Sequence, residues 1–295
     1  MGYWRGERAS IHLEDAEVLA HAAFAGEQYV LSLRAPETAR RALAGQFVHL
    51  TCGPGLPMRR PLSLMRVQPE SGSIELLYKV LGEGTALLAG RRPGERLSLL
   101  GPIGRPFRQE GYRRLPLLIG GGVGIPPMIF LAEHLRRTAR HVNPLVLMGS
   151  EIPFPFTPRP STRLVPELPG EAIAAMPLLE DWGIASRLAS RQGFPGCFDG
   201  FVTDLARLWL GALAPAARAE VEIYACGPTP MLQAVQALAA EFDLPAELSL
   251  EEHMACAVGG CAGCTVLIEE EGRRAMRRVC VDGPVFAAQT VVFQG

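Results

Sequence analysis

The sequence predicts a multidomain β and α/β protein: an antiparallel β-barrel, then a parallel-sheet α/β domain, then a small C-terminal domain stapled by cysteines. Short apolar runs separated by turn residues indicate the first part, and two strand-glycine-helix segments indicate the second. A late cluster of cysteines and glycines indicates the third. We expect domains at residues 1–107, 108–245 and 246–295.

Composition places the chain among globular proteins. Its 295 residues are 48% hydrophobic and 20% charged, which is enough to bury two ordinary cores. A formal net charge of −1, with both signs spread along the chain, argues against nucleic acid or a membrane surface as partner. The first fifteen residues are too charged for a signal peptide, and no window reaches the roughly 18 apolar residues of a membrane span. We expect a cytoplasmic protein whose seven cysteines serve metal or redox chemistry.

Four apolar runs in the first domain read as strands of an antiparallel barrel or sandwich. They are QYVLSL at 28–33, QFVHL at 46–50, SIELLYKV at 73–80 and RLSLL at 96–100. The segment GPIGRPF at 101–107 reads as a break between domains.

The second domain reads as two βαβ-type units. In the first, PLLIG at 116–120 leads through glycines to a helix over 127–138 and a strand at 144–149. The second covers 221–242. Its helix face carries Met231, Leu232, Val235 and Leu238. Between the two units, a proline-rich stretch marks an insertion at about 150–201, and in the last domain TVLIEE and TVVF are expected strands.

Four cysteines carry the strongest chemical signal. Three follow the C-x4-C-x2-C spacing of plant-type [2Fe-2S] ferredoxins, and a fourth lies further along the chain, as such a cluster requires. A structural zinc site is the alternative, although zinc favours paired C-x2-4-C knuckles, and inert core cysteines are a third reading. Of the isolated cysteines, Cys52 and Cys197 read as small buried hydrophobes. The predicted metal ligands are Cys256, Cys261, Cys264 and Cys280.

Two glycine turns predict a dinucleotide cleft. GGGVGIPP at 120–127 joins a strand to a helix, so backbone can approach a diphosphate at the helix N-terminus. The turn lacks the G-x-G-x-x-G fingerprint, and an ordinary tight turn is the alternative. ACGP at 225–228 ends a second strand of the same sheet, where α/β sheets place ligands. The candidate contacts are Gly121, Gly122, Gly124, Gly227 and Pro228.

Glu151 follows the strand after the first helix. Its carboxylate can accept hydrogen bonds from an adenosine ribose and repel a 2′-phosphate, which favours NAD over NADP. A solvated loop glutamate is the alternative.

A further group of residues suits a flavin. Arg60 can pair with a phosphate, Ser63 can bond the ring or ribityl chain, and Gly84 and Thr85 can present donors at a helix start. Arginines beside prolines are more often surface turns, so these residues alone are a weak signal.

The order of these motifs resembles the ferredoxin-reductase superfamily. LEEHMAC at 250–256 and VCVDGPVF at 279–286 are similar to the electron-transfer subunit of the NAD-linked class of dihydroorotate dehydrogenase. The resemblance runs from about residue 15 to residue 293. Two features depart from the family pattern: the segment 150–201 is longer, and GPIGRPF replaces a more glycine-rich linker.

The resemblance implies an oxidoreductase subunit that carries FAD and a [2Fe-2S] cluster and uses NAD(H) as substrate. It implies a heterotetramer, two plus two, with an FMN-containing catalytic subunit that oxidises dihydroorotate to orotate in pyrimidine biosynthesis. The four cysteines would hold the cluster, and the nicotinamide would lie near residues 121–124 and 226–228. The implied FAD contacts are Arg60, Pro61, Leu62, Ser63, Leu77, Tyr78, Lys79, Gly84 and Thr85.

In the implied electron path a flavin connects the [2Fe-2S] cluster, which exchanges one electron at a time, with the nicotinamide, which exchanges two as hydride. No side chain need act as acid or base, and Cys226 is expected to pack against the nicotinamide ring. Three alternatives stay open: a related reductase subunit for sulfite reduction or ferredoxin-linked transhydrogenation, an NADH-dependent donor to oxygenases, and a zinc-stapled binding module without redox activity.

Overall fold

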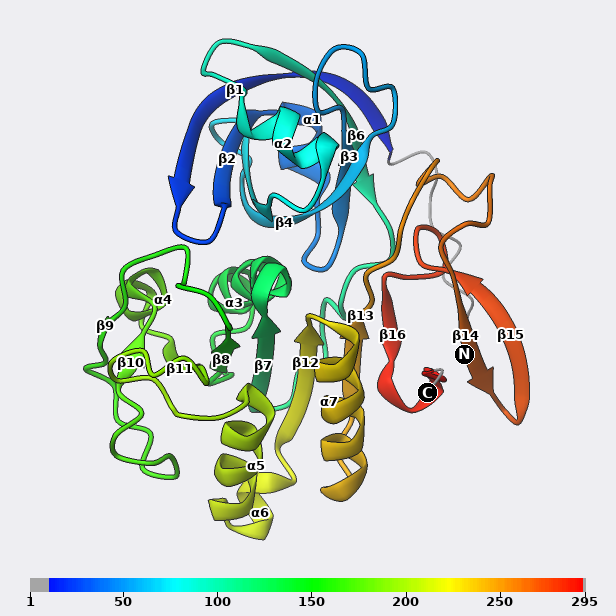
Figure 1. The fold of residues 1–295 in the computed structure, drawn as a ribbon. Helices are drawn as coiled ribbons and strands as arrows, with labels where there is room; N and C mark the ends of the chain where they lie inside the picture. Colours follow the sequence, from blue (N-terminus) through cyan, green and yellow to red (C-terminus); the bar gives the residue numbers. More distant parts are fainter. Residues whose placement is uncertain (1–10, 294–295) are drawn as a thin grey trace. The chain divides into compact units, whose positions relative to one another are not determined.

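The computed structural model describes residues 11–293 and divides them into two compact units (Figure 1). The first unit combines residues 11–107 with Leu250–Phe286 and 290–293, and the second combines Arg108–Ser249 with Ala287–Gln289. The first ten residues, which hold most of the charged start of the chain, lie outside the described part. Division into three domains, at 107 and 245, stays a prediction. Over residues 11–293 we find no helix with the length and apolar character needed to cross a membrane.

The first unit contains a closed antiparallel barrel with strand order β1-β2-β5-β4-β3-β6. Side chains along each strand point alternately into and out of the barrel, and those that point inward form its core. Leu31 and Leu33 on β2 are fully buried, as are Leu64 on β4 and Leu76 on β5. The four predicted runs are therefore confirmed as strands. The elements are β1 (His12–Phe24), β2 (Gln28–Arg34), α1 (Pro36–Arg41), β3 (Phe47–Leu50), β4 (Arg60–Gln68), β5 (Ser73–Lys79), α2 (Glu83–Ala89) and β6 (Arg96–Ile103).

One boundary differs from expectation. Strand β6 continues to Ile103, three residues into the segment that the sequence indicated as a break. Its last residues stay in the barrel because Phe47 on β3 pairs with Ile103.

The second unit holds five parallel strands in the order β11-β8-β7-β12-β13. Helix α3 packs on β7, while α5 and α7 pack against each other and on β8 and β12 (Figure 1). Both predicted strand-helix units are confirmed. The elements are β7 (Leu115–Gly121), η2 (Gly122–Gly124), α3 (Ile125–Thr138), β8 (Leu145–Gly149), β9 (Arg159–Pro160), β10 (Ala174–Ala175), α4 (Pro177–Trp182), β11 (Ala185–Ala189), α5 (Val202–Ala212), α6 (Pro215–Arg218), β12 (Val221–Cys226), α7 (Thr229–Glu241) and β13 (Ala246–Ser249).

The segment 150–201 does more than interrupt the sheet. It carries the small β9–β10 pair and helix α4, and then β11, which pairs in parallel with β8. Ala189 on β11 lies opposite Gly149 on β8, so both strands end at the same edge. Its status as an insertion relative to the family stays a prediction.

The cluster segment is a loop followed by an antiparallel ribbon, β14 (Thr265–Glu270) and β15 (Arg273–Arg278) (Figure 1). The predicted strand TVLIEE is confirmed as β14. The predicted strand TVVF is wrong, because β16 (Val285–Ala287) ends earlier and the 3-10 helix η3 (Ala288–Thr290) follows it. Only a single bridge, from Val291 to Ile268, remains there among the described residues.

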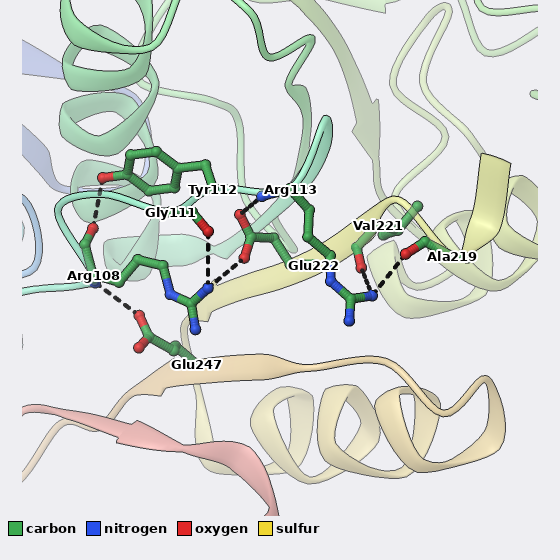
Figure 2. Close-up of polar contacts among 8 residues, drawn as sticks. All are labelled: Arg108, Gly111, Tyr112, Arg113, Ala219, Val221, Glu222 and Glu247. Atoms are coloured by element: carbon green, nitrogen blue, oxygen red, sulfur yellow. Dashed lines mark hydrogen bonds and ion pairs between the residues drawn. The ribbon is translucent and has the colours of Figure 1, made fainter. Parts of the chain in front are cut away.

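A buried carboxylate anchors the start of the second unit to its sheet (Figure 2). Glu222 on β12 is 3% exposed and accepts the backbone N–H of Arg113 at 2.8 Å and a guanidinium N–H of Arg108 at 3.3 Å. The N–H of Arg108 donates to Glu247 on β13 at 3.0 Å, and the Tyr112 hydroxyl donates to the Arg108 carbonyl at 2.6 Å. The chain entering β7 is thus held by two neighbouring strands.

Burial raises the pKa of Glu222 above its ordinary value of 4.5, although the bonds from Arg113, Tyr224 and Arg108 oppose the rise. A raised folded-state pKa gives stability that is complete below pH 4.5 and is lost as pH rises through the folded value. Relative to Glu222→Gln, the wild type should therefore lose stability as the pH rises from 4.5 through the folded-state pKa, by about 1.4 kcal/mol for each unit by which that pKa is raised.

Urea unfolding followed by tryptophan fluorescence measures this, because Trp182 and Trp209 both lie in the second unit. The exposed Glu220 provides the control variant Glu220→Gln. A constant difference between wild type and Glu222→Gln across this range would contradict the prediction.

Candidate functional site

The chain reverses its direction across the sheet between β7 and β12. From β7 it moves outward through β8 to β11, then returns to β12 and moves the other way to β13. Right-handed crossovers therefore place α3 and α7 on opposite faces. Open α/β sheets bind ligands at such a switch point, outside the carboxyl ends of the strands. Both predicted glycine turns leave the sheet here, since Cys226 at the end of β12 lies opposite Gly120 near the end of β7.

The two turns touch each other through backbone. A Cβ atom on Gly124 would overlap the carbonyl group of Cys226 and lie 2.5 Å from the nitrogen of Gly227. The α-carbon of Gly121 lies 3.2 Å from where a Cβ on Gly227 would be. Only glycine allows this approach. The two turns therefore lie together at one end of the sheet, while the predicted dinucleotide cleft and its contacts with a nucleotide stay predictions.

Met231 is a neighbour of this site whose role the sequence did not indicate. The helix periodicity marked it as a core residue, but it is half-buried, unlike Leu232 and Val235 on the same helix. A Cβ on Gly121 would lie 2.5 Å from its sulfur, and a Cβ on Gly227 would lie 2.6 Å from its methyl group. Its thioether therefore covers both glycines.

The remaining predicted residues of this edge differ in exposure. Cys226 is 0% exposed at the end of β12, and Pro228 is the residue that caps helix α7. Gly122 has a φ of 53°, and a Cβ atom added there would meet nothing within 4 Å. Glu151 is exposed at the loop after β8 and accepts a hydrogen bond from Gln192 at 3.1 Å.

The predicted flavin residues lie where two barrel strands separate. The ladder between β4 and β5 begins only at Leu64 and Leu76. The preceding residues 60–63 pair with β3 alone, and residues 77–79 pair with β2 alone. Backbone donors and acceptors along these two facing edges are therefore outside the ladder, and residues 60–63 are all half-exposed. The structure brings together two sets of residues that sequence reasoning grouped only by resemblance.

Arg60 and Gly84 form one side of this opening. A Cβ on Gly84 would lie 2.7 Å from Nε of Arg60, so the guanidinium lies against bare backbone at the start of α2. Within residues 11–293 Arg60 has no acidic partner, and one of its N–H groups donates to the carbonyl of Met58 at 3.0 Å. Thr85 is already engaged, because its hydroxyl oxygen accepts the N–H groups of Leu81 and Gly82.

Tyr78 faces the inside of the barrel wall. Its hydroxyl lies 2.8 Å from Nε2 of His21, and its ring stacks on Tyr29 at 5.4 Å. Burial raises the pKa of its phenol, so the group is protonated at neutral pH. Its neighbours Leu77 and Lys79 are buried and half-exposed respectively. Side-chain contact of Tyr78 with a flavin stays a prediction.

The ribbon β14–β15 brings two predicted ligands together. Cys264 precedes β14 and Cys280 follows β15, and the hairpin turn at Glu271 and Gly272 has positive φ at both positions. The N–H of Val279 donates to the carbonyl of Cys264 at 2.9 Å, and the two sulfurs lie 3.3 Å apart. These cysteines are nearly fully buried. Closing the hairpin therefore makes half of a four-thiolate site.

The other two cysteines lie on the loop before the ribbon. Left-handed conformations at Ala257, Gly259 and Ala262 turn successive backbone N–H groups toward a common centre, the pattern of an anion-binding nest. Accordingly, the N–H of Cys261 donates to the sulfur of Cys256 at 3.4 Å. The sulfur of Cys261 accepts from Gly263 at 3.5 Å. Small residues make this loop possible, as the sequence indicated.

The thiols of this site ionise unequally. Burial raises the pKa of Cys256, but backbone donors, Cys261 first, outweigh it and bring the value to about 6. Burial, with the neighbouring Cys264, raises the pKa of Cys280 to about 12. Metal binding requires deprotonated thiolates, so Cys280 needs the charge of a metal to ionise near neutral pH, whereas Cys256 does not.

No three His, Cys, Asp or Glu side chains in residues 11–293 are grouped as a single ion would need. The observed unit is the close pair Cys264 and Cys280. Two close thiolates are what one iron of a [2Fe-2S] cluster takes.

Arg278 is a further residue of this site that the sequence did not indicate. It donates to the carbonyl of Gly259 at 3.0 Å and is held by Asp282, whose carboxylate accepts the Arg278 N–H at 2.8 Å. It thus ties the cysteine loop to the ribbon. The charged run RRAMRR concealed it, because every other arginine of that run extends into solvent or pairs along the ribbon. The isolated Cys52 is buried as predicted, while Cys197 is only half-buried.

Comparison with known proteins gives the family. Residues 251–292 match the family model of the iron-sulfur cluster binding domain of dihydroorotate dehydrogenase B. Over 282 residues the chain is 33% identical to the dihydroorotate dehydrogenase B (NAD(+)) electron transfer subunit of Desulforamulus reducens, covering 95% of this chain and 98% of that one. The chain belongs to the family of dihydroorotate dehydrogenase B electron transfer subunits. A member from Geobacillus is 34% identical over 283 residues. The resemblance drawn from the motifs is confirmed.

Solved structures agree with this family assignment. A chain of the NADH-dependent reduced ferredoxin-NADP oxidoreductase has a TM-score of 0.75 at 25% identity and covers 95% of this chain and 90% of its own length. Phthalate dioxygenase reductase has a TM-score of 0.56 at 15% identity, which shows the fold alone. The barrel and parallel sheet of dihydroorotate dehydrogenase B electron transfer subunits are thus shared with reductases of several kinds.

Gly124→Ala tests the contact between the two turns. The added methyl group must displace backbone of Cys226, so we expect a loss of about 1–3 kcal/mol in the free energy of unfolding. Urea unfolding by tryptophan fluorescence reports it. In the control Gly211→Ala, the methyl group enters open space on helix α5 and should stabilise by about 0.5–1 kcal/mol. Equal stability of Gly124→Ala and wild type would mean that the turns do not touch.

Proposed function

We propose that this chain transfers electrons between an FMN-containing dihydroorotate dehydrogenase catalytic subunit and NAD during pyrimidine biosynthesis in the cytoplasm. The observation that carries the proposal is the hairpin that places Cys264 beside Cys280, in the same compact unit as the separated edges of β4 and β5. One unit therefore holds both the predicted cluster cysteines and the separated edges of β4 and β5.

The cluster ligands in this proposal are Cys256, Cys261, Cys264 and Cys280. The ribbon fixes the spacing of the buried pair, and the nest supplies donors to the sulfurs of the loop pair. Hydrogen bonds to cluster sulfurs and a nearby positive charge both tune reduction potential. Arg278, which is paired with Asp282, holds the loop in place through the carbonyl of Gly259.

The FAD contacts in this proposal lie along residues 60–63 and 77–79. Arg60 pairs with a phosphate oxygen, since its guanidinium has no acid to satisfy it in the described chain. The hydroxyl of Ser63 makes no hydrogen bond within residues 11–293, and the residue is half-exposed on the same strand. Thr85 shapes the turn before α2, which leaves Gly84 to give backbone access.

The nicotinamide nucleotide lies at the switch point in this proposal. Gly121, Gly124 and Gly227 keep the turns thin enough for backbone to approach a diphosphate. Cys226 and Met231 border the turns. When bound, FAD and the cluster supply two-electron exchange with the nucleotide and one-electron exchange with the partner. The chain's own task is to bind and orient, and no side chain need move a proton.

The partner in this proposal is the catalytic subunit that completes dihydroorotate dehydrogenase B, as a heterotetramer of two copies of each. A second candidate is a reductase subunit of the ferredoxin-NADP oxidoreductase kind, which the TM-score of 0.75 favours. The two differ in partner, and the same cofactors serve both.

Anaerobic absorption spectroscopy and reconstitution test the proposal together. Purified chain should contain about two irons and one FAD, and its visible bands should bleach with NADH. Mixed with the FMN subunit, it should reduce NAD⁺ when dihydroorotate is added. Reduction of NADP⁺ from ferredoxin, with none from dihydroorotate, would establish the second candidate. Zinc without a chromophore would overturn both.

Cys280→Ser tests the cluster site. Loss of one buried thiolate should lower the iron content from about two per chain to near zero and remove the cluster absorption, leaving the flavin bands. Cys197→Ser is the matched control, because Cys197 lies in the other unit and is half-buried. Full iron content in Cys280→Ser would exclude Cys280 as a ligand.

Arg60→Ala tests the flavin site. Removing the guanidinium should weaken FAD binding at least about tenfold, because a charge-assisted phosphate contact is lost. FAD retained after gel filtration is the measurement, and Arg60→Lys should lie between, since an ammonium keeps charge but not the fork. The exposed Arg92, changed to alanine, should keep its FAD. Wild-type retention by Arg60→Ala would place the phosphates elsewhere.

A further inference from the structure

Two neighbouring loops at the nucleotide edge are built alike. After β8, the serine oxygen of Ser150 accepts the N–H of Ile152 at 3.3 Å. After β11, the oxygen of Ser190 accepts the N–H of Gln192 at 3.2 Å. Each serine folds its loop and leaves the residue that follows it exposed. Because Ala189 and Gly149 are opposite each other, the two exposed residues emerge side by side at one sheet edge.

These exposed residues, Glu151 and Arg191, carry opposite charges but do not form an ion pair. The carboxylate of Glu151 instead accepts the side-chain amide of Gln192 at 3.1 Å. The guanidinium of Arg191 lies 4.9 Å from the centre of the Phe201 ring and has no acidic partner within residues 11–293. The two loops therefore keep the carboxylate of Glu151 and the guanidinium of Arg191 apart, and each charged group contacts a neutral side chain instead.

The contact of Arg191 with Phe201 and the contact of Glu151 with Gln192 have different consequences for a bound nucleotide. A cation-π contact at an exposed site contributes about 0.5–1 kcal/mol, and Phe201 is 51% exposed. An anion that forms a stronger contact with Arg191 can therefore displace the Phe201 ring. The amide of Gln192 fixes the carboxylate of Glu151 without neutralising it. A nucleotide with a free ribose 2′-hydroxyl can donate to that carboxylate, whereas a 2′-phosphate is repelled by it and attracted by Arg191.

We propose that Glu151, oriented by Gln192, selects the nucleotide without a 2′-phosphate. Arg191 would bind a 2′-phosphate, but the carboxylate of Glu151 repels that group and prevents the contact. This inference rests on the proposed binding of the nucleotide at the switch point. Gln192 acts through Glu151 and is a positioning residue. The segment 150–201, which the sequence left without a role, then supplies the specificity of the enzyme.

Calorimetric titration of the whole chain with ADP and with adenosine 2′,5′-bisphosphate tests the inference without any redox step. Wild type should bind ADP more tightly. Glu151→Gln should raise affinity for the bisphosphate at least about tenfold relative to ADP, since a charge-assisted contact replaces a repulsion. The double variant Glu151→Gln, Arg191→Ala should lose that gain. Gln192→Ala should weaken ADP binding about two- to fivefold, as expected for one neutral hydrogen bond.

Steady-state diaphorase assays with NADH and NADPH provide the second readout. In Glu151→Gln the ratio of kcat/KM for NADPH to that for NADH should rise about tenfold, chiefly through a lower KM for NADPH. Glu171→Gln, an exposed acid of the same segment, should leave the ratio unchanged. Ratios unmoved in Glu151→Gln would overturn the inference while leaving the electron-transfer function intact. Failure of wild type to oxidise either nucleotide would instead overturn the proposed function.

Discussion

The parallel ladder between β7 and β12 is the constraint on which the nucleotide half of the molecule depends. These strands are the point from which the chain spreads in both directions, so helices leave their neighbouring ends toward opposite faces of the sheet. The turn after β7 and the turn after β12 lie against each other there. Glycine at 124 and at 227 allows this contact, since a side chain on Gly124 would overlap the backbone of Cys226. Ligand access and sheet pairing are satisfied by the same small residues.

The first unit meets a different constraint, because it must hold four thiolates in a chain segment too short for a core of its own. It does so by closing a two-stranded ribbon whose ends carry Cys264 and Cys280. The ribbon has an exposed, charged surface and little apolar burial. Its register is supported by the ion pairs of Arg274 with Glu269 and of Arg277 with Glu270. Geometry at the sulfurs thus depends on a ribbon whose own stability is modest, which the cluster would reinforce when bound.

Periodicity predicted the elements that bury one face. Strands β2, β3, β5 and β6 and helices α3 and α7 were found because alternation or a helical stripe marks a buried side. It missed β15, whose residues are mostly exposed, and β1, whose run AHAAF alternates little in hydropathy. Strand β4 is absent from the predicted apolar runs, because Pro61 near its start is typical of a turn or an edge strand. Strand β11 was hidden inside a proline-rich segment.

In the candidate site, too, features with a local sequence signal were predictable and features that depend on contacts between distant segments were not. Cysteine spacing and glycine turns are local signals, so the iron-sulfur domain and the position of the two turns at neighbouring strand ends were predictable. Met231, Arg278 and Gln192 were not, because each acts across a distance in sequence that only the fold closes. The separation of β4 from β5 is also invisible in one strand alone, since it is a property of their pairing.

The order of the chain has a consequence for electron tunnelling. After building the α/β unit the chain returns to the barrel unit, so the second unit is inserted between two parts of the first. On the proposed assignments the flavin edge and all four thiolates belong to one body. The tunnelling distance between flavin and cluster is then a fixed property of that body. Motion of the nucleotide unit would change the distance between the flavin edge and the nucleotide, but it would leave the distance between the flavin edge and the thiolates unchanged.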